Sequence, residues 1–230
     1  MRASDFEFRY RFWIISALFF AAFGCYVFDH LTAAQRFARL IRQDSRFGVQ
    51  LVLGVGALLA LLAAWIRTWA SAYLHSTVVK DADIHADRLV ADGPYRHLRN
   101  PLYFGTLLLG ISFGLMANPA GFFLLVGGLT IFVLRLIGRE EVELEAIQGA
   151  AYRRYVRAVP ALLPAFEPRV EASGTRPHWR QAFLGEAMMW IFAIGCTLFA
   201  ITLIPWILYV FVAAGFIGYF PVRRVARRAS

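Results

Sequence analysis

The chain has 230 residues, 59% of them hydrophobic, and a mean hydropathy of +0.56. A soluble domain of this size could not bury so much apolar surface, so the composition excludes a water-soluble globular protein and indicates an integral membrane protein. The formal net charge is +9. The basic residues lie in short loops and at the ends of apolar runs, as the positive-inside rule describes, so no nucleic-acid partner is expected.

Several apolar runs approach the roughly 20 residues that a helix needs to cross a bilayer. They lie near Phe12–Phe28, Val49–Ile66, Leu102–Met116, Ala120–Ile137, Phe183–Ile204 and Trp206–Phe220. Asn118-Pro119 is typical of a tight turn, so the third and fourth runs are expected to form a hairpin. The last two runs are separated by Pro205, which leaves open one kinked helix in their place. We therefore expect an all-α polytopic transmembrane bundle of about six spans, or five, forming one domain over residues 1–230.

Lysines and arginines set the expected orientation of this bundle. They cluster before the third run, after the fourth run and at the end of the chain, so with six spans these groups face the cytoplasm. Both termini are then cytoplasmic, and an inner or plasma membrane is expected. The segment Leu31–Gly48 conflicts with this topology, because its arginines would lie outside. An amphipathic helix in the outer interface would account for them, with its apolar face formed by Phe37, Leu40 and Ile41.

Familiar catalytic and metal-binding signatures are missing from the sequence. There is no Walker loop, GxSxG or HExxH motif, and G54-V-G-A-L-L lacks the third glycine of a dinucleotide fingerprint. A soluble Rossmann domain is thereby excluded. Cys25 and Cys196 lie in apolar runs without Cys/His clustering, so neither a disulfide nor a metal site is expected.

The segment R135-L-I-G-R-E-E-V-E-L-E-A-I147 places a carboxylate on an apolar helix face. At 100° per residue Glu140 falls at the centre of an apolar stripe made of Val133, Leu136, Ile137, Leu144 and Ile147. A buried unpaired carboxylate costs several kcal/mol, so Glu140 needs a partner. Two partners remain open: a structural ion pair with Arg135 or Arg139, or a cation or hydroxyl group of a ligand.

Four linked motifs resemble a known family in order and spacing. They are L89-V-A-D-G-P-Y-R-H-L-R-N-P-L-Y103, Asn118-Pro119, R139-E-E-V-E-L144 and G149-A-A-Y-R-R-Y-V-R-A-V-P-A-L-L-P164. Together, over about residues 89–164, they resemble the isoprenylcysteine carboxyl methyltransferase family, within the wider group of membrane methyltransferases that includes phospholipid N-methyltransferases. The resemblance implies methyl transfer from S-adenosyl-L-methionine, which enters from the cytosol, to a lipophilic acceptor that enters from the bilayer.

The resemblance also carries over residues of the site. It implies cofactor contacts from Leu89, Val90, Gly93, Tyr95, Asn100, Pro101, Tyr103, Glu140 and Glu141. It implies a catalytic role for Arg99, Glu140 and Arg139, with Arg99 holding a carboxylate of the cofactor or of the acceptor. Tyr152 and Tyr155 match as well, and either close the site from the tail or pack the helix. Asn100 stands where the isoprenylcysteine enzymes usually have His, and Asn cannot titrate.

The sequence leaves open the identity of the methyl acceptor and the role of one further carboxylate. A carboxylate or thiolate acceptor needs no general base, whereas an amine must lose a proton, so an anionic acceptor is favoured over a phospholipid amine. A nicotinamide-dependent membrane reductase is also compatible with the sequence, as is a nonenzymatic lipid-binding or transport protein. Glu186 in the fifth run is a candidate by its position in the membrane, or it pairs with Arg180.

Overall fold

The computed structural model describes the backbone of residues 1–80 and 91–228 and the side chains of residues 1–74, 91–215 and 217. In this part of the chain the regular elements are all helical. The α-helices are α1 (Asp5–Arg9), α2 (Arg11–Gly24), α3 (Ala33–Leu40), α4 (Arg46–Lys80), α5 (Pro101–Met116), α6 (Pro119–Gln148), α7 (Ala150–Ala158), α8 (Trp179–Gly185), α9 (Ala187–Thr202) and α10 (Pro205–Arg228). Two short 3-10 helices are η1 (Cys25–Val27) and η2 (Gly93–Arg96). The prediction of an all-helical fold is confirmed.

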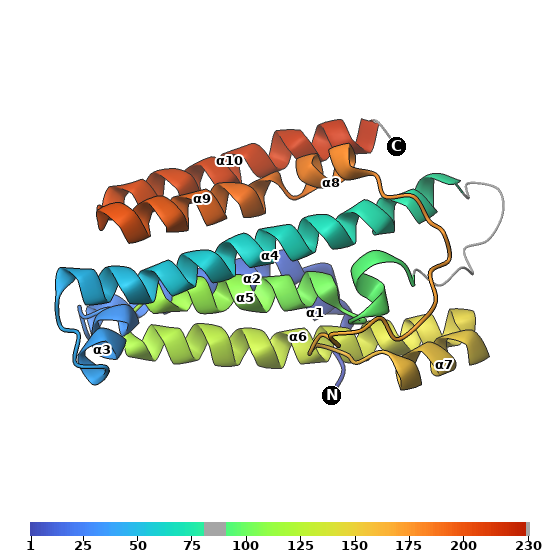
Figure 1. Cartoon of the computed structure of the whole chain (residues 1–230), viewed down its shortest axis with the longest axis horizontal. Helices are drawn as coiled ribbons and strands as arrows, with labels where there is room; N and C mark the ends of the chain where they lie inside the picture. Colours follow the sequence, from blue (N-terminus) through green and yellow to red (C-terminus); the bar gives the residue numbers. More distant parts are fainter. Residues whose placement is uncertain (81–90, 229–230) are drawn as a thin grey trace.

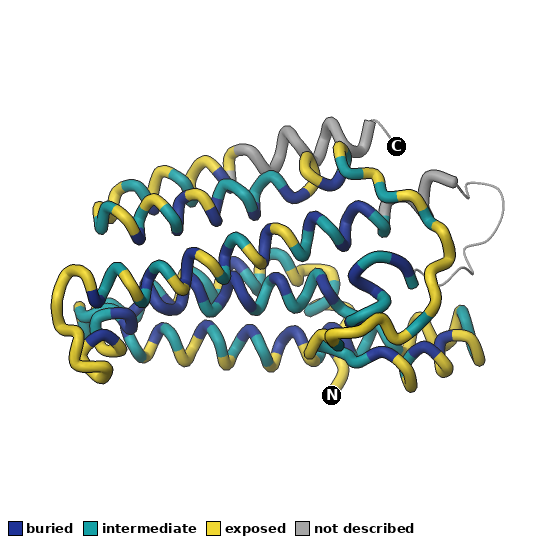
Figure 2. The backbone as a smooth tube through the Cα atoms, viewed as in Figure 1, coloured by how far each residue is buried: buried dark blue, intermediate teal, exposed yellow. Residues whose placement is uncertain are grey.

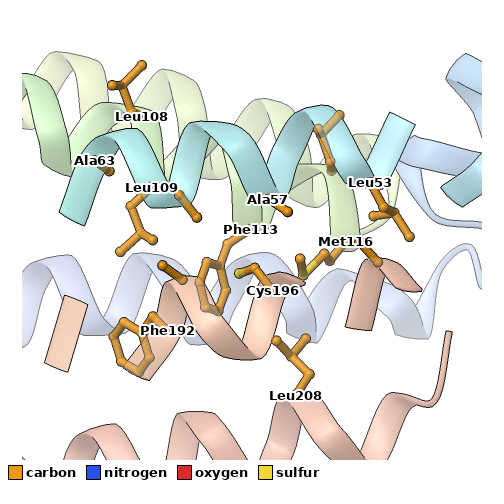
Figure 3. Close-up of a cluster of buried hydrophobic side chains, with 14 of the residues drawn as sticks. Leu53, Ala57, Ala63, Leu108, Leu109, Phe113, Met116, Phe192, Cys196 and Leu208 are labelled. Atoms are coloured by element: carbon orange, nitrogen blue, oxygen red, sulfur yellow. The ribbon is translucent and has the colours of Figure 1, made fainter. Parts of the chain in front are cut away.

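Helix α4 is the central element of the bundle. Figure 1 shows it between the α9–α10 pair on one side and the α5–α6 pair on the other, and α4 packs on both α5 and α9. Its buried face is made of small residues, among them Ala57, Ala60 and Ala64, which let the neighbouring backbones approach closely. The largest apolar core lies here, and Figure 3 shows Phe113 of α5 and Phe192 of α9 within it.

The outer faces of the long helices are apolar as well. On α4 the exposed side chains Leu51, Val55, Leu58, Leu62 and Trp65 recur every three or four residues and form one stripe. Figure 2 shows exposed and buried positions alternating along α4 and α6 in this way. A soluble helix would place polar residues on that face, so the stripe is suited to contact with lipid.

The predicted hairpin is confirmed, and Asn118 explains its geometry. Its side chain caps α6 by accepting a hydrogen bond of 2.8 Å from the backbone N–H of Gly121, and Pro119 occupies the first turn. The amide nitrogen of Asn118 donates to the carbonyl oxygens of Cys25 (2.6 Å) and Asp29 (3.0 Å). The turn is therefore fixed to the end of α2 as well as to α6.

The last two apolar runs form two helices packed side by side, so the possibility of one kinked helix is wrong. Leu203 ends α9 in the left-handed region at φ 57°, and Pro205 then begins α10. Helices α9 and α10 pack along each other, as Figure 1 shows. The axis of α8 is bent by 63° relative to α9, at Glu186.

The prediction of six spans is not confirmed. By length and composition two helices of the described chain can cross a membrane, Arg46–Leu74 and Pro119–Gln148, and the bent α8–α9 pair would make a third if it is one span. Helices α5 and α9 each have 16 residues, and such a helix rises ~24 Å, short of the ~30 Å hydrocarbon core. The apolar helices nevertheless identify a membrane protein.

The segment expected to be an amphipathic helix contains α3. Its buried residues are Ala33, Ala34 and Ala38, which face the bundle. Leu40 and Ile41 are exposed on the outside of the molecule, whereas the ring of Phe37 also contacts that of Phe122, at a centroid distance of 5.9 Å. Most of the apolar face expected from the sequence therefore points outward, where an interfacial helix would meet lipid.

Candidate functional site

The candidate site lies where a long connection returns over the start of α5. We call this connection, residues 159–178, the strap; Figure 1 shows it running from α7 to α8 past η2. It is tied to the η2 region by backbone hydrogen bonds, from Arg99 N to Pro160 O (2.9 Å), from Ala165 N to His97 O (2.9 Å) and from Arg169 N to Arg96 O (2.8 Å). The segment before α5 and the segment after α7 therefore lie side by side.

Glycine is required at the start of η2. Gly93 has φ 57°, and a Cβ atom there would lie 2.4 Å from the ring of Tyr73. Tyr95, two residues later, is buried, and its carbonyl oxygen accepts a hydrogen bond of 2.7 Å from the Tyr155 hydroxyl. Tyr152 is buried beside Tyr155, and burial raises its pKa to about 12. The two tyrosines therefore pack η2 against α7 as neutral side chains, which places them behind the site.

Asp92 fastens the far part of the strap. It is buried and accepts hydrogen bonds from the backbone N–H groups of Ser173 and Thr175, each 2.8 Å long, and from the Ser173 hydroxyl. Burial alone would raise the pKa of Asp92, but these hydrogen bonds outweigh it and hold the pKa below its usual value. Asp92 is therefore an ionised anchor of the strap.

Arg99 connects the start of α5 to α6 and to the strap through hydrogen bonds. Its Nε and Nη2 atoms donate to Glu141 Oε1 at 3.0 and 2.7 Å. Its Nη1 atom donates to the carbonyl oxygens of Val156 (2.8 Å) and Val159 (2.6 Å). Three groups of the protein thus occupy the guanidinium, so the arrangement favours Arg99 as a positioning residue over the predicted direct role in holding a carboxylate of a ligand.

Asn100 and Pro101 continue the same junction. The side-chain amide of Asn100 donates to the carbonyl oxygen of Ala161 at 3.1 Å, and Pro101 is the first residue of α5. Proline suits this position, because the N–H that it lacks has no partner within the helix. Asn100 therefore holds the strap through a hydrogen bond. This role does not need a side chain that titrates, as histidine does.

Glu140 is paired with a tyrosine. The Tyr103 hydroxyl donates a hydrogen bond of 2.7 Å to Glu140 Oε1. Neither arginine expected for a structural ion pair contacts Glu140: Arg135 bonds Glu7 at 2.7 Å, and Arg139 bonds Asp5 at 2.6 Å and Glu143 at 2.8 Å. In the described part of the chain the structural ion pair is therefore absent. The apolar stripe is also shorter than expected, because Leu144 and Ile147 are exposed where α6 extends beyond the bundle.

The N-terminal segment covers α6 beside this pair. Besides the two ion pairs, Ala3 N donates to Arg135 O at 2.9 Å, and the guanidinium of Arg139 lies 4.7 Å from the ring centroid of Phe8. Hydrogen bonds from Arg135 and from the backbone of Ser4 lower the pKa of Glu7 to about 2. The predicted catalytic residue Arg139 is thus enclosed by α1 rather than facing Tyr103.

The carboxylates of Glu140 and Glu141 each retain binding capacity. Within the described part of the chain, the Oε2 atom of each has no hydrogen-bond partner. Adjacent carboxylate oxygens beside a helix start are suited to an ammonium group and to ribose hydroxyls, which S-adenosyl-L-methionine carries. The residues present therefore fit that cofactor. Leu89 and Val90, also predicted to contact it, lie outside the described residues.

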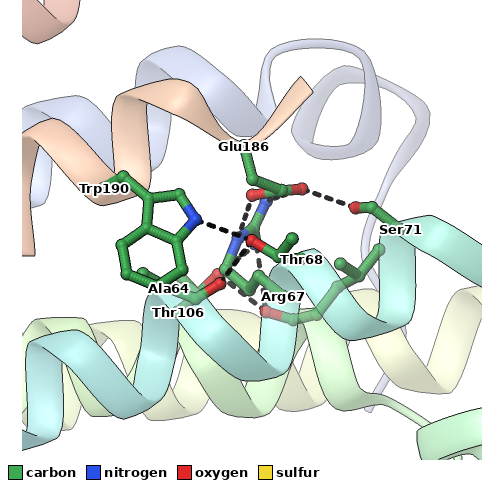
Figure 4. Close-up of polar contacts among 8 residues, drawn as sticks. Ala64, Arg67, Thr68, Ser71, Thr106, Glu186 and Trp190 are labelled. Carbon is green, nitrogen blue, oxygen red and sulfur yellow. Dashed lines mark hydrogen bonds and ion pairs between the residues drawn. The ribbon is translucent and has the colours of Figure 1, made fainter. Parts of the chain in front are cut away.

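A second polar centre lies deeper in the bundle; its Glu186 was a candidate from the sequence, but Arg67 was not predicted. Arg67 of α4 donates from Nε to Glu186 Oε2 at 2.8 Å and from Nη2 to Oε1 at 3.2 Å, as Figure 4 shows. Its Nη1 atom donates to the carbonyl oxygen of Leu102 (3.0 Å) and to the Thr106 hydroxyl (2.9 Å), and Ser71 donates to Glu186 Oε1 at 2.7 Å. The expected pairing of Glu186 with Arg180 is wrong; the partner is Arg67.

A cavity of about 280 Å³ opens beside Arg67. Residues of α2, α4, α5, α9 and α10 line it, and the lining is mostly apolar. Arg67 is the one charged residue among these described lining residues. The cavity therefore combines an apolar body with one polar end.

Comparison with known proteins finds a similarity in the central part of the chain. Residues 51–151 match the family model described as phospholipid methyltransferase. This segment, a little under half of the chain, is similar to that membrane methyltransferase family. A search of curated proteins and a search of solved structures found no match. The phospholipid methyltransferase segment contains Arg67, η2, Tyr103 and Glu140, and it begins 38 residues before the motif region expected to start at residue 89.

Arg67 was not predicted from the sequence, because the second apolar run was expected to end at Ile66. A signal was present, since W65-I-R-T-W-A70 places the arginine between aromatic and aliphatic residues and α4 continues well beyond it. A charged residue inside such a run is rare in membranes and marks a functional candidate.

Proposed function

We propose that the protein transfers a methyl group from S-adenosyl-L-methionine to a lipophilic acceptor at the polar end of the bundle. The observation that carries this proposal is the pair Tyr103–Glu140 next to Arg99–Glu141, two carboxylates with free oxygens at the junction of α5, α6 and the strap. The phospholipid methyltransferase match over residues 51–151 supports the reaction class.

Each residue of the candidate site has a separate role in this proposal. Glu140 and Glu141 hold the ammonium group or ribose hydroxyls of the cofactor, and Tyr103 fixes the rotamer of Glu140 through its hydrogen bond. Arg99 keeps Glu141 and the strap in place. Gly93 and Tyr95 supply the backbone of η2 as the cofactor's border.

The bound cofactor supplies an electrophilic methyl group on a sulfonium ion, whose sulfur keeps the electron pair of the broken bond while the acceptor's lone pair forms the new one. The protein must align the acceptor and exclude water, which a site closed by the strap and by apolar helices can provide. An anionic acceptor would cancel charge with the sulfonium, and a site of low dielectric constant favours that step.

The test is transfer of a radiolabelled methyl group to acceptors of three kinds, using the purified protein in lipid nanodiscs. We expect labelling of a long-chain carboxylic acid or thiol and a large loss of rate in Glu140→Gln. Labelling of neither would contradict the preferred acceptor class. The absence of transfer to every acceptor, with intact folding, would contradict the reaction.

Methylation of a phospholipid amine is the second candidate. The specific observation in its favour is the phospholipid methyltransferase family model that matches residues 51–151. Phosphatidylethanolamine is therefore the third acceptor of the assay. Because an ammonium group must lose a proton before attack, this reaction would speed up as the pH rises toward the amine's pKa, whereas a carboxylate reaction would show no such rise.

A further inference from the structure

We propose that the cavity beside Arg67 binds one hydrocarbon chain of the methyl acceptor and that Arg67 is the residue that orients the acceptor's polar head. This inference rests on the proposed function, because it assigns a place to the acceptor of that reaction. The ligand class is an amphiphile with a hydrocarbon chain and, at its polar end, an oxygen that accepts a hydrogen bond.

The shape and chemistry of the cavity suit a hydrocarbon chain. Its body is lined by Phe19, Phe113, Phe192 and Leu208, apolar side chains from four different helices. The volume of about 280 Å³ lies near the lower limit of small-molecule sites, ~300–1,000 Å³. A cavity of this size with a mostly apolar lining is suited to part of a hydrocarbon chain.

The mouth of the cavity faces the lipid. Phe20 of α2 and Tyr209 of α10 belong to the lining and are nevertheless 63% and 70% exposed, so they mark the open side. Helix α10 packs along α9, whereas α2 packs along α6. The opening therefore lies between helices of two different packed pairs, on the surface where the apolar side chains of both face outward. A chain can enter there from the bilayer without passing through water.

Arg67 can bind the polar head of the ligand at the inner end of the cavity. A guanidinium has five N–H groups, and four of them are used by Glu186, Leu102 O and Thr106. Within the described residues the remaining N–H, on Nη2, has no partner and is available to an oxygen acceptor. The ion pair with Glu186 makes this end electrically neutral overall, so it is suited to a carbonyl or carboxylate oxygen and does not require a strongly charged phosphate.

The first two turns of α5 connect the cavity to the candidate site. Leu102 and Thr106 face Arg67 on α4, and Tyr103 between them bonds Glu140 on α6. Ile15 of α2 lines the cavity and also packs against Tyr103. A head group held at Arg67 would therefore lie about one helical turn from the tyrosine that positions Glu140.

The test is photo-crosslinking of a diazirine-bearing stearic acid to the full chain in phosphatidylcholine nanodiscs without any methyl donor. Cross-links mapped by mass spectrometry are expected at Phe113, Phe192 and their neighbours. Val212→Phe fills the cavity and should lower the cross-linking yield about tenfold, since overpacking a site is costly. The matched control is Val210→Phe, on the same helix but exposed and outside the lining, and it should leave the yield unchanged.

Further arms of the experiment identify the source of the hydrocarbon chain and test the role of Arg67. Excess oleic acid, lysophosphatidylethanolamine or dioleoyl phosphatidylethanolamine is added as competitor, and the one that removes the cross-links identifies a single-chain or a diacyl source. In Arg67→Gln/Glu186→Gln, which leaves no charge unpaired, the chain should still bind, but a higher concentration of the diazirine-bearing stearic acid should be needed for the same cross-linking yield. An unchanged concentration dependence in this folded variant would remove Arg67 from the head-group site.

Failure of this inference is distinguishable from failure of the proposed function. Cross-links spread over the exposed faces, with equal yields in the two valine variants, would overturn the cavity as a chain site. Methyl transfer with an unchanged KM for the acceptor in Val212→Phe would overturn it too, while leaving the reaction intact. Cavity cross-links without any methyl transfer would support a lipid site and contradict the reaction alone.

Discussion

The substitution Glu140→Gln separates ligand binding from structural pairing. In the described chain Glu140 bonds Tyr103 and forms no direct ion pair, and Arg11 acts on it only at longer range, so the variant breaks no salt bridge. The amide oxygen of Gln can still accept the tyrosine hydrogen bond, at a cost of ~1 kcal/mol for the lost charge assistance. Removing a partly buried negative charge offsets that cost. We therefore expect the melting temperature of the ligand-free variant to stay within a few degrees of the wild type.

The response to ligand should change much more. S-adenosylhomocysteine at 100 times its Kd stabilises the wild type by ~2.7 kcal/mol, and a loss of ~2 kcal/mol in affinity, about 30-fold, leaves ~0.9 kcal/mol in the variant. At ~2–4 °C per kcal/mol for a chain of this size, the ligand-induced shift falls from about 5–11 °C to about 2–4 °C.

The assay is thermal unfolding in detergent with and without S-adenosylhomocysteine. Glu145→Gln is the matched control, because Glu145 lies on the same helix but is exposed and pairs with Arg153 across 3.4 Å. It should keep the wild-type shift. A large fall in the ligand-free melting temperature of Glu140→Gln, together with an undiminished ligand shift, would refute the assignment and make Glu140 a structural residue.

Three further predictions concern stability. Arg67→Gln alone leaves Glu186 buried and unpaired and should cost ~3–5 kcal/mol; the double variant with Glu186→Gln should recover most of it, and equal melting of the two would contradict the ion pair's role. Arg99→Lys loses the fork that bonds a carboxylate and two carbonyls, so the strap should be cleaved faster by protease, and unchanged cleavage would count against Arg99 as its anchor. Hydrogen bonds from Arg135 hold the pKa of Glu7 at about 2, below its ordinary 4.5, so its stabilisation is complete above pH 4.5 and is lost as the pH falls toward 2. Glu7→Gln should remove that part of the pH dependence of unfolding, and an identical pH profile would contradict it.

Much of the scaffold could be predicted because its signals are local. Hydropathy located the helices, and Asn118-Pro119 located the hairpin, since a capping side chain and a proline act on neighbouring backbone groups. The helical wheel correctly placed Glu140 on the inner side of α6, because the positions that surround it there, such as Leu136 and Ile137, are buried. These features depend on residues a few positions apart.

The partners of the charged residues could not be predicted in the same way. Arg67 and Glu186 are 119 positions apart, and Arg135 pairs with Glu7 across 128 positions. Such pairs depend on which helices pack together and at what axial offset, which periodicity within one helix does not determine. The number of spans was not confirmed for a related reason, because hydropathy does not tell whether a short apolar run such as that of α5 crosses the membrane or is buried in the bundle.

The central claim is that the junction of α5, α6 and the strap binds the methyl donor. Calorimetric titration of the full chain with S-adenosylhomocysteine and, in parallel, with NADPH tests it most directly. The account predicts saturable heat with S-adenosylhomocysteine that is strongly weakened in Glu140→Gln and preserved in Glu145→Gln, and no saturable heat with NADPH. Binding of NADPH without binding of S-adenosylhomocysteine would contradict the account and favour a reductase.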